Sequence, residues 1–150
     1  MQHYIIDGNN LIGKIKSLRN LQKKDGKTAR EKLALLIDRF FAGKHVKVSL
    51  DFDGYENLSI RLSKGRVYYS QSKTADDLIK HQIEMEKNPR NATVVSSDSN
   101  VVEFARVCHC NLMKSEEFAA NLLKQKDVDE EENLKRNISN NEIKKLFGLE

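Results

Sequence analysis

The sequence predicts an α/β fold in which helices cover both faces of a mostly parallel central sheet. Short apolar segments alternate along the chain with segments of helical spacing, which is typical of β-α-β units. The length of 150 residues suits one hydrophobic core, and a content of 39% hydrophobic and 32% charged residues is typical of a globular domain. We therefore expect one α/β domain over residues 1–124 and an appendage over residues 125–150.

The expected strands are short apolar segments bounded by polar or turn-forming residues. In chain order they are residues 3–7 (HYIID), the alternating Val46, Val48 and Leu50, residues 58–70, residues 92–95, and a short segment near Leu112 and Met113. Residues 58–70 can form either a hairpin that turns at Lys64-Gly65 or one strand with a return.

The expected helices lie between these strands and carry apolar residues at helical spacing. After a loop or short helix at 10–20, they are residues 28–43, a helix between Thr74 and Pro89, a helix through 101–105, and one that starts near Ser115. Thr28, Thr74 and Ser115 have side chains that commonly cap a helix N-terminus. Gly43 stands where a glycine often follows a helix C-terminus.

Residues 125–150 differ in composition from the rest of the chain. The acidic segment 127–132 (DVDEEE) is expected to be a solvated, flexible linker. Ile143, Leu146 and Phe147 are spaced as on a short amphipathic helix after that linker. This helix either docks on the domain or binds a partner, and docking is the simpler expectation because monomers seldom expose apolar patches.

Basic residues are concentrated in the first half of the chain. Residues 1–73 carry 15 Lys/Arg against 7 Asp/Glu, whereas residues 74–150 carry 11 against 15. Eight basic side chains lie between Lys14 and Lys32. Such a surface attracts phosphates and favours a nucleic-acid partner, although a solvated helix face would have the same composition.

The chain carries no pattern of membrane insertion or oxidative folding. Asp7 interrupts the first apolar segment, and no segment approaches the ~18 apolar residues of a membrane span. Cys108 and Cys110 are too close in sequence for an unstrained disulfide, so we expect free thiols. These features predict a cytoplasmic protein without a membrane partner.

Acidic residues stand where strands end and where one helix begins. They are Asp7, Asp53 and Asp98 after strands, and Asp76 and Asp77 at the start of a helix. In an open parallel sheet these positions converge on one crevice at the carboxyl ends of the strands. Clustered carboxylates repel one another and are best neutralised by a hard cation such as Mg²⁺ or Mn²⁺. A helix cap or a solvated loop end would explain any single one of these acids.

Four motifs in order identify a resemblance to a known family. They are residues 7–13 (DGNNLIG), 52–55 (FDGY), 74–77 (TADD) and 96–98 (SSD). With them the chain resembles the NYN nucleases, particularly their YacP-like bacterial branch, within the PIN-like superfamily. The resemblance implies a PIN-like three-layer α/β/α sandwich, a divalent-metal site and endoribonuclease activity. The branch includes a ribosome-associated enzyme that cuts messenger RNA, which makes RNA the expected substrate and the ribosome a candidate partner.

The resemblance also implies roles for particular residues. Asp7, Asp76 and Asp98 are the implied core metal ligands for Mg²⁺ or Mn²⁺, and Asp53 and Asp77 the implied auxiliary acids. All five are therefore candidate catalytic residues.

The sequence departs from the family pattern at three places. Asn9 stands where the family usually has tyrosine, and Gly54 where it usually has alanine, whereas Asn10 matches the family's asparagine. The acidic segment 127–132 replaces the long basic tail of some relatives, so the resemblance does not by itself carry ribosome binding to this chain.

Contacts to RNA are expected from Asn10, Lys14, Arg66 and Lys73. The adjacent pair Tyr68 and Tyr69 has rings that suit stacking on unpaired bases, which favours single-stranded RNA. Because consecutive strand residues face opposite sides, at least one of the two rings is expected to pack in the core.

Two alternatives belong to other functional classes. The segment LDFDGY resembles the motif of haloacid-dehalogenase-type phosphatases, with Asp51 as nucleophile and Asp53 as acid/base. Two features differ from that motif. The phosphatase motif normally ends in Thr or Val where this chain has Tyr55, and it normally lies on the first core strand, whereas here it comes after the strand that ends at Asp7. The other alternative is a non-catalytic RNA-binding PIN-like module whose acids are structural.

Overall fold

The computed structural model describes residues 1–56 and 59–146, and side chains as far as residue 136. Its centre is a five-stranded parallel sheet in the order β3-β2-β1-β4-β5. The strands are β1 (Gln2–Asp7), β2 (Val46–Phe52), β3 (Gly65–Tyr69), β4 (Ala92–Val95) and β5 (Asn111–Met113). The predicted α/β class with a parallel sheet is confirmed.

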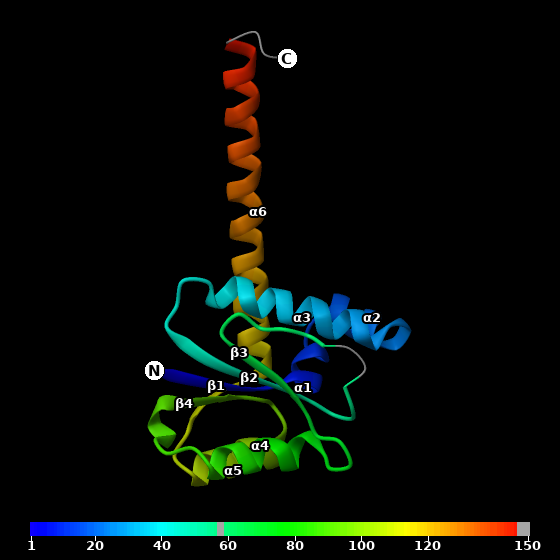
Figure 1. Ribbon diagram of the computed structural model, residues 1–150, viewed down its shortest axis with the longest axis vertical. Helices are drawn as coiled ribbons and strands as arrows, with labels where there is room; N and C mark the ends of the chain where they lie inside the picture. The colour runs from blue at the N-terminus through cyan, green and yellow to red at the C-terminus, as the bar shows by residue number, and fades with distance from the viewer. Residues whose placement is uncertain (57–58, 147–150) are drawn as a thin grey trace.

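Helices cover both faces of this sheet (Figure 1). They are α1 (Gly8–Ile12), α2 (Lys16–Lys24), α3 (Gly26–Phe41), α4 (Ala75–Glu84), α5 (Ser99–Val107) and α6 (Ser115–Leu146), with a 3-10 turn η1 (Pro89–Asn91). Figure 1 shows α3 and the base of α6 on one face and α4 and α5 on the other, which gives three layers.

Alternation along the strands divides the apolar residues between two cores. Ile6, Leu50 and Val95 face the layer of α1, α3 and α6, where Phe41 and Phe118 are fully buried. The other core lies under α4 and α5, and its members are Ile5, Ile79, Ile83, Ala92, Val94, Val101, Ala105 and Cys110. Since successive strand residues point to opposite faces, the odd-numbered residues of β1 face α4 and α5.

The structure corrects the expected cap of α3 and decides between the two alternatives for residues 58–70. Asp25, not Thr28, caps α3: its carboxylate accepts from the Thr28 N–H at 3.1 Å, because the helix already begins at Gly26. For residues 58–70, of the two alternatives, the structure has one strand: residues 65–69 pair parallel to β2, and a single antiparallel bridge between Leu62 and Gly65 is all that forms of the hairpin in the described residues.

Helix α6 differs from the expected linker and short helix. It runs without a break from Ser115 to Leu146, so the acidic segment 127–132 is helical, and Figure 1 shows this part projecting from the domain. Arg39 on α3 contacts Asp129 at 3.5 Å. Phe147 lies outside the described residues, and the division of the chain at residue 124 stays a prediction. None of the helices in the described ranges has both the length and the apolar character that a membrane crossing needs.

Gly8 is required where β1 turns into α1. A Cβ there would lie 2.5 Å from Phe52 Cε1 and 2.7 Å from the Asp51 carbonyl oxygen. Both neighbours belong to β2, whose backbone is fixed in the sheet. The glycine therefore allows α1 to begin immediately after Asp7 and to stay packed against the end of β2.

We expect Gly8→Ala to lower the free energy of unfolding by about 1–3 kcal/mol, the usual range for an added methyl group in a packed site. Gly26→Ala is the matched control, because its Cβ would meet only the flexible Gln22 side chain, at 3.3 Å, and should change stability by less than about 0.5 kcal/mol. Urea denaturation of both variants measures the difference. Equal stability of the two would contradict the close packing at Gly8.

Candidate functional site

The carboxyl edge of the parallel sheet gathers the predicted acids. Asp7 ends β1 and Asp53 follows β2. Asp98 follows β4, the strand that pairs with β1 on its other side. Asp76 and Asp77 form the first turn of α4, which follows β3. Strand order reverses between β1 and β4, so this edge is the topological switch point at which α/β sheets bind ligands.

Asp7 is the most buried of the five predicted site acids, with 4% of its surface exposed. The Ser96 hydroxyl donates to its Oδ2 at 2.8 Å. Burial raises the pKa of the Asp7 carboxyl to about 6; the charges of Asp76 and Asp98 add to the rise, and the bond from Ser96 opposes it. Three carboxylates from separate segments are thus close enough to affect one another.

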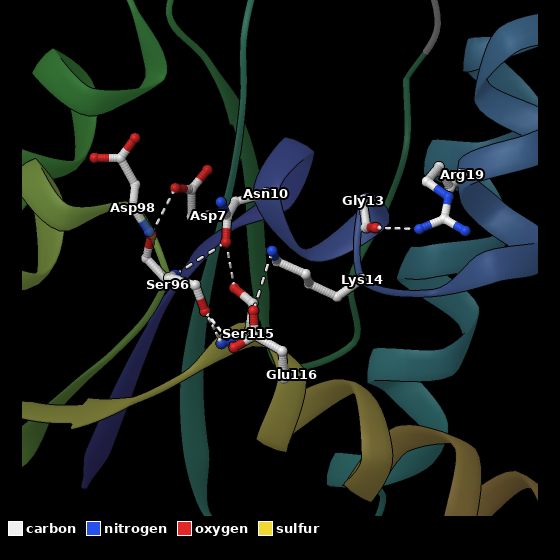
Figure 2. A network of polar contacts seen from close by, with 10 residues as sticks. Asp7, Asn10, Gly13, Lys14, Arg19, Ser96, Asp98, Ser115 and Glu116 are labelled. Carbon is white, nitrogen blue, oxygen red and sulfur yellow. Dashed lines mark hydrogen bonds and ion pairs between the residues drawn. The ribbon is translucent and has the colours of Figure 1, made fainter.

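Asp98 and Asp76 border Asp7 from two helix N-termini. Asp98 caps α5 through Oδ1, which accepts from the N–H groups of Asn100 and Val101 at 2.9 and 3.3 Å. Figure 2 shows its carboxylate beside that of Asp7. The pKa of Asp76 is raised, first by burial and then by the charge of Asp98. The repulsion between these acids is what a bound cation would relieve.

Asp53 and Asp77 have structural partners that account for their positions. Asp53 Oδ1 accepts from the Ala75 N–H at 2.7 Å, which ties the loop after β2 to the start of α4. Asp77 completes a capping box with Thr74 and is exposed. The expected N-cap role of Thr74 is thus confirmed, and Asp77 has a structural explanation that Asp76 lacks.

The donor set at this edge has the chemistry of a hard-cation site. All the side chains involved offer oxygen, as Mg²⁺ and Mn²⁺ prefer, and Asp7 and Asp76 have raised pKa values that a nearby cation would lower. Within the described part of the chain, however, no three Asp, Glu, His or Cys side chains are already arranged to hold a metal ion. The acids fit in kind, and their role as ligands stays a prediction.

A polar network connects α1 and the residues just after it to the segments after β4 and β5 (Figure 2). Asn10 Oδ1 accepts from the Ser97 N–H at 3.0 Å and from the Ser115 hydroxyl at 2.6 Å. Lys14 contacts Glu116 at 3.0 Å, and the Ser97 hydroxyl donates to the other Glu116 oxygen at 2.6 Å. The Ser115 hydroxyl therefore donates to Asn10. Helix α6 already begins at Ser115, so this residue is not the N-cap that the sequence predicted.

The expected RNA contacts fall on two different parts of the surface. Lys73 lies exposed in the loop before α4, at the same edge as the acids. Arg66 pairs with Ser49 at the beginning of β3, so the parallel register carries it away from that edge. Tyr69 packs beside Phe52, with ring centroids 6.1 Å apart, as expected for one ring of the pair.

Asp51 is fully buried and cannot serve as the nucleophile of a phosphatase. It faces α4, where Gln82 Nε2 donates to its Oδ1 at 2.8 Å, while Asp51 Oδ2 and Gln82 Oε1 are buried without partners in the described structure. Burial raises the pKa of Asp51 to about 8, so the carboxyl is largely protonated at neutral pH. The haloacid-dehalogenase alternative required an exposed, ionised Asp51.

His3 joins three elements at the opposite end of the sheet. Its Nε2 lies 2.7 Å from Ser49 Oγ and its Nδ1 lies 2.7 Å from Glu86 Oε2. These distances are those of a serine nucleophile with its base and orienting acid. Ser49, however, lies within β2, whose backbone is hydrogen-bonded to β1 on one side and β3 on the other, so the N–H groups of β2 itself are not free to stabilise an oxyanion. We assign the trio a structural role.

The sequence interpretation named Ser96, Ser97 and Ser115 without the side-chain contacts they make at this edge, and it missed Glu116 altogether. Ser96, Ser97 and Ser115 each donate to a side chain of the network. The signal for Ser96 and Ser97 was present, since both stand between a buried strand and Asp98. Glu116 had no such signal, because its partner Lys14 is distant in the sequence.

Comparisons with known proteins agree with this fold. The family model of the YacP-like NYN domain matches residues 4–147. The crystal structure of Rae1 (YacP) from Bacillus subtilis is similar with a TM-score of 0.72 at 20% identity, covering 99% of this chain and 88% of that one. The structure of its W164L mutant gives a TM-score of 0.68 at 18% identity, over 87% and 80% of the two chains. No curated protein has a significant match to this chain.

The buried Asp51 predicts a pH-dependent stability. Its pKa is about 8 in the folded chain against an ordinary value of 3.8, so between these values the folded state keeps a proton that the unfolded chain loses. The free energy of unfolding should therefore fall as pH rises from about 5 to 8, by up to about 1.4 kcal/mol per pH unit from this group.

Asp51→Asn should flatten this slope, because Asn does not titrate and its Nδ2 can donate to the unpartnered Gln82 Oε1. Urea denaturation of the native chain and the variant at pH 5, 6, 7 and 8 measures it. Parallel pH profiles for the two proteins would show that Asp51 is ionised in the folded state.

Proposed function

The chain belongs to the YacP-like NYN domain family, and we propose that it is a divalent-metal-dependent endoribonuclease. Family membership supports a nuclease-type, RNA-related function. The finer proposal is hydrolysis of phosphodiester bonds within RNA at the carboxyl edge of the sheet. The observation that carries it is the mutual proximity of Asp7, Asp76 and Asp98, expressed in the raised pKa values of the first two.

In this proposal Asp7, Asp76 and Asp98 would hold the cation, Mg²⁺ or Mn²⁺. When bound, such an ion activates water and offsets the charge that develops on a phosphate. Ser96 fixes the Asp7 carboxylate by donating to Oδ2, and its oxygen also accepts the Asp98 N–H at 3.1 Å. One hydroxyl thus sets the spacing of two acids from neighbouring strands, before any substrate binds.

Charge distribution supports RNA as the substrate. In Figure 1, β1 runs toward the side of the molecule on which α1 and α2 lie. β1 ends at Asp7, so α2, which belongs to the basic segment 14–32, lies on the side to which the acid-bearing ends of the strands point. Arg30 is engaged in packing, with its guanidinium 4.8 Å from the centre of the Phe52 ring. The exposed Lys73 lies at the carboxyl edge of the sheet with the acids, and the exposed lysines of α2 add positive charge to the surface for a polyanionic substrate.

The natural substrate in this proposal is messenger RNA or another ribosome-linked RNA, cut in single-stranded regions. This part depends on the family alone. A cytoplasmic, bacterial setting and the ribosome as partner belong to the same proposal. To test the ribosome as partner, the cleavage rate of one messenger RNA is measured when the RNA is free and when ribosomes are bound to it. Equal rates for the two would exclude the ribosome as a required partner.

A non-catalytic RNA-binding module is the second candidate, because Asp53, Asp77 and Asp98 all have structural partners. Incubation with RNA and with a small phosphomonoester, with Mg²⁺, with Mn²⁺ and with chelator, separates the classes. A nuclease cuts RNA only with the cation, a phosphatase releases phosphate, and a binding module does neither.

Asp98→Asn and Asp7→Asn should each reduce RNA cleavage roughly 100-fold or more, because each removes a carboxylate that holds the cation. Asp7→Asn should also raise the free energy of unfolding at pH 7.5 by about 1–3 kcal/mol, since the native carboxyl ionises with a pKa of about 6 instead of 3.8. Gel assays of RNA cleavage and urea denaturation measure the two effects.

The matched control for these acids is Glu103→Gln, which removes a charge from the exposed face of α5, where Glu103 pairs with Arg106 at 2.6 Å. It should leave cleavage and stability nearly unchanged. Cleavage by Asp98→Asn at the native rate, or undiminished cleavage in chelator, would contradict the mechanism. Unfolding of both Asn variants would instead make the acids structural.

Lys73→Ala should weaken RNA binding and reduce the slope of log K against log salt by about 0.7, the effect of one lost contact to a single strand. Lys14→Ala should have a smaller effect of the same sign, because Lys14 is paired with Glu116 at 3.0 Å in the native chain. Lys87→Ala is the control, because Lys87 is exposed just after α4, away from the N-terminal turn that carries Asp76. Fluorescence anisotropy at several salt concentrations in chelator gives these slopes. An unchanged slope would remove the residue from the interface.

A further inference from the structure

Glu116 places a carboxylate among donors that suit a phosphate. Its Oε1 lies 3.0 Å from Lys14 Nζ, and its Oε2 accepts from the Ser97 hydroxyl at 2.6 Å. Figure 2 shows Lys14 reaching Glu116 beside Asn10 and Ser115. These contacts hold the pKa of the Glu116 carboxyl at about 2, so it is an anion at every physiological pH.

The donors around Glu116 are carried by backbone that contacts other than those of Glu116 hold in place. The Ser97 hydroxyl accepts from the Ser115 N–H at 3.0 Å, and the Ser97 N–H is held by Asn10. Lys14 follows α1, and its N–H donates to the Leu11 carbonyl at 3.0 Å. A cation and a hydroxyl from two different strand ends are thus directed at one point, and the ligand that meets them here is an anionic oxygen pair.

This point is adjacent to the acidic cluster. Ser97 lies between Ser96, which bonds Asp7, and Asp98. A nucleic-acid strand whose phosphate reached Ser97 would therefore have a neighbouring part of its backbone at the acids. Glu116 and Lys14 are half-exposed, with 52% and 36% of their side-chain surfaces accessible, so the carboxylate can move into solvent without unfolding α6.

We propose that Lys14 and Ser97 form a backbone-phosphate subsite for RNA beside the acidic cluster, and that Glu116 occupies it when RNA is absent. This proposal depends on the proposed function for its ligand. Glu116 then acts as an internal competitor: RNA must displace it to reach Lys14, and the displaced carboxylate remains near the incoming phosphate. The native chain accordingly binds RNA less tightly than its lysines alone would allow.

Glu116→Gln and Glu117→Gln form a matched pair for the test. Both remove one negative charge from the first turn of α6, and only Glu116 contacts Lys14 and Ser97. In chelator, Glu116→Gln should bind a fluorescent single-stranded RNA about three- to tenfold more tightly than the native chain, whereas Glu117→Gln should change Kd less than about twofold. The salt slope of Glu116→Gln should be steeper by about 0.7, because Lys14 becomes free for phosphate.

Second variants separate loss of competition from other effects. Adding Lys14→Ala to Glu116→Gln should remove the gain in affinity, and so should adding Ser97→Ala. Equal affinities for the two Gln variants, or a gain that survives Lys14→Ala, would overturn the proposal. Thermal denaturation of each variant identifies any that fails to fold, and Lys14→Ala and Ser97→Ala provide two independent routes to the same result.

The outcome is distinguishable from that of the proposed function. Binding is measured without cation, so an absence of RNA cleavage would refute the nuclease while a tighter Glu116→Gln complex still supported the subsite. Inorganic phosphate, titrated against the amide signals of Ser97 and Ser115, provides the second arm. If Glu116→Gln bound inorganic phosphate more tightly than the native chain but bound RNA no more tightly, RNA would be excluded as the ligand of the subsite.

Discussion

The parallel direction of all five strands is the constraint on which the candidate site depends. It brings the ends of β1, β2 and β4 to one edge, although their acids are far apart in the sequence. Gly8 makes the arrangement tight, because it lets α1 begin directly after Asp7 against the end of β2. The chemistry of each acid is then set by its depth: Asp7 is buried, Asp76 half-buried, and Asp53 exposed.

That depth has an energetic consequence. Ionised Asp7 beside Asp76 and Asp98 destabilises the folded chain, and Asp51 behind it is folded most favourably as the neutral acid. Such groups persist where function requires them, since apolar residues would pack more stably. The Ser96 hydroxyl and the Gln82 amide lower the cost only in part, because each supplies a single hydrogen bond. The carboxylates at this edge therefore repel one another, and either a bound cation or protonation of one carboxylate would reduce that repulsion.

Local signals in the sequence were sufficient for most elements but not for pairings over long distances. Thr74 with Asp77 is a complete capping box in four residues, so the start of α4 was readable. Asp25 and Thr28 are both good caps, and which of them caps α3 depends on where the preceding helix ends. Whether residues 65–69 return beside residues 58–62 or beside β2 is decided by tertiary packing, which sequence patterns do not encode. The contact between Lys14 and Glu116 likewise depends on tertiary packing, because the two residues are distant in the sequence, and it could not be predicted.

Helix α6 links the site to the rest of the chain. Its first residues complete the network around Asn10, its next turns bury Phe118 and Leu122 in the core, and its later part continues outward with Arg39 holding Asp129. The buried Phe118 and Leu122 therefore fix the position of the turn that carries Glu116. The network around Asn10, and with it the pairing of Glu116 with Lys14, is thus built on the part of α6 that packs against the domain, and not on the acidic segment 127–132.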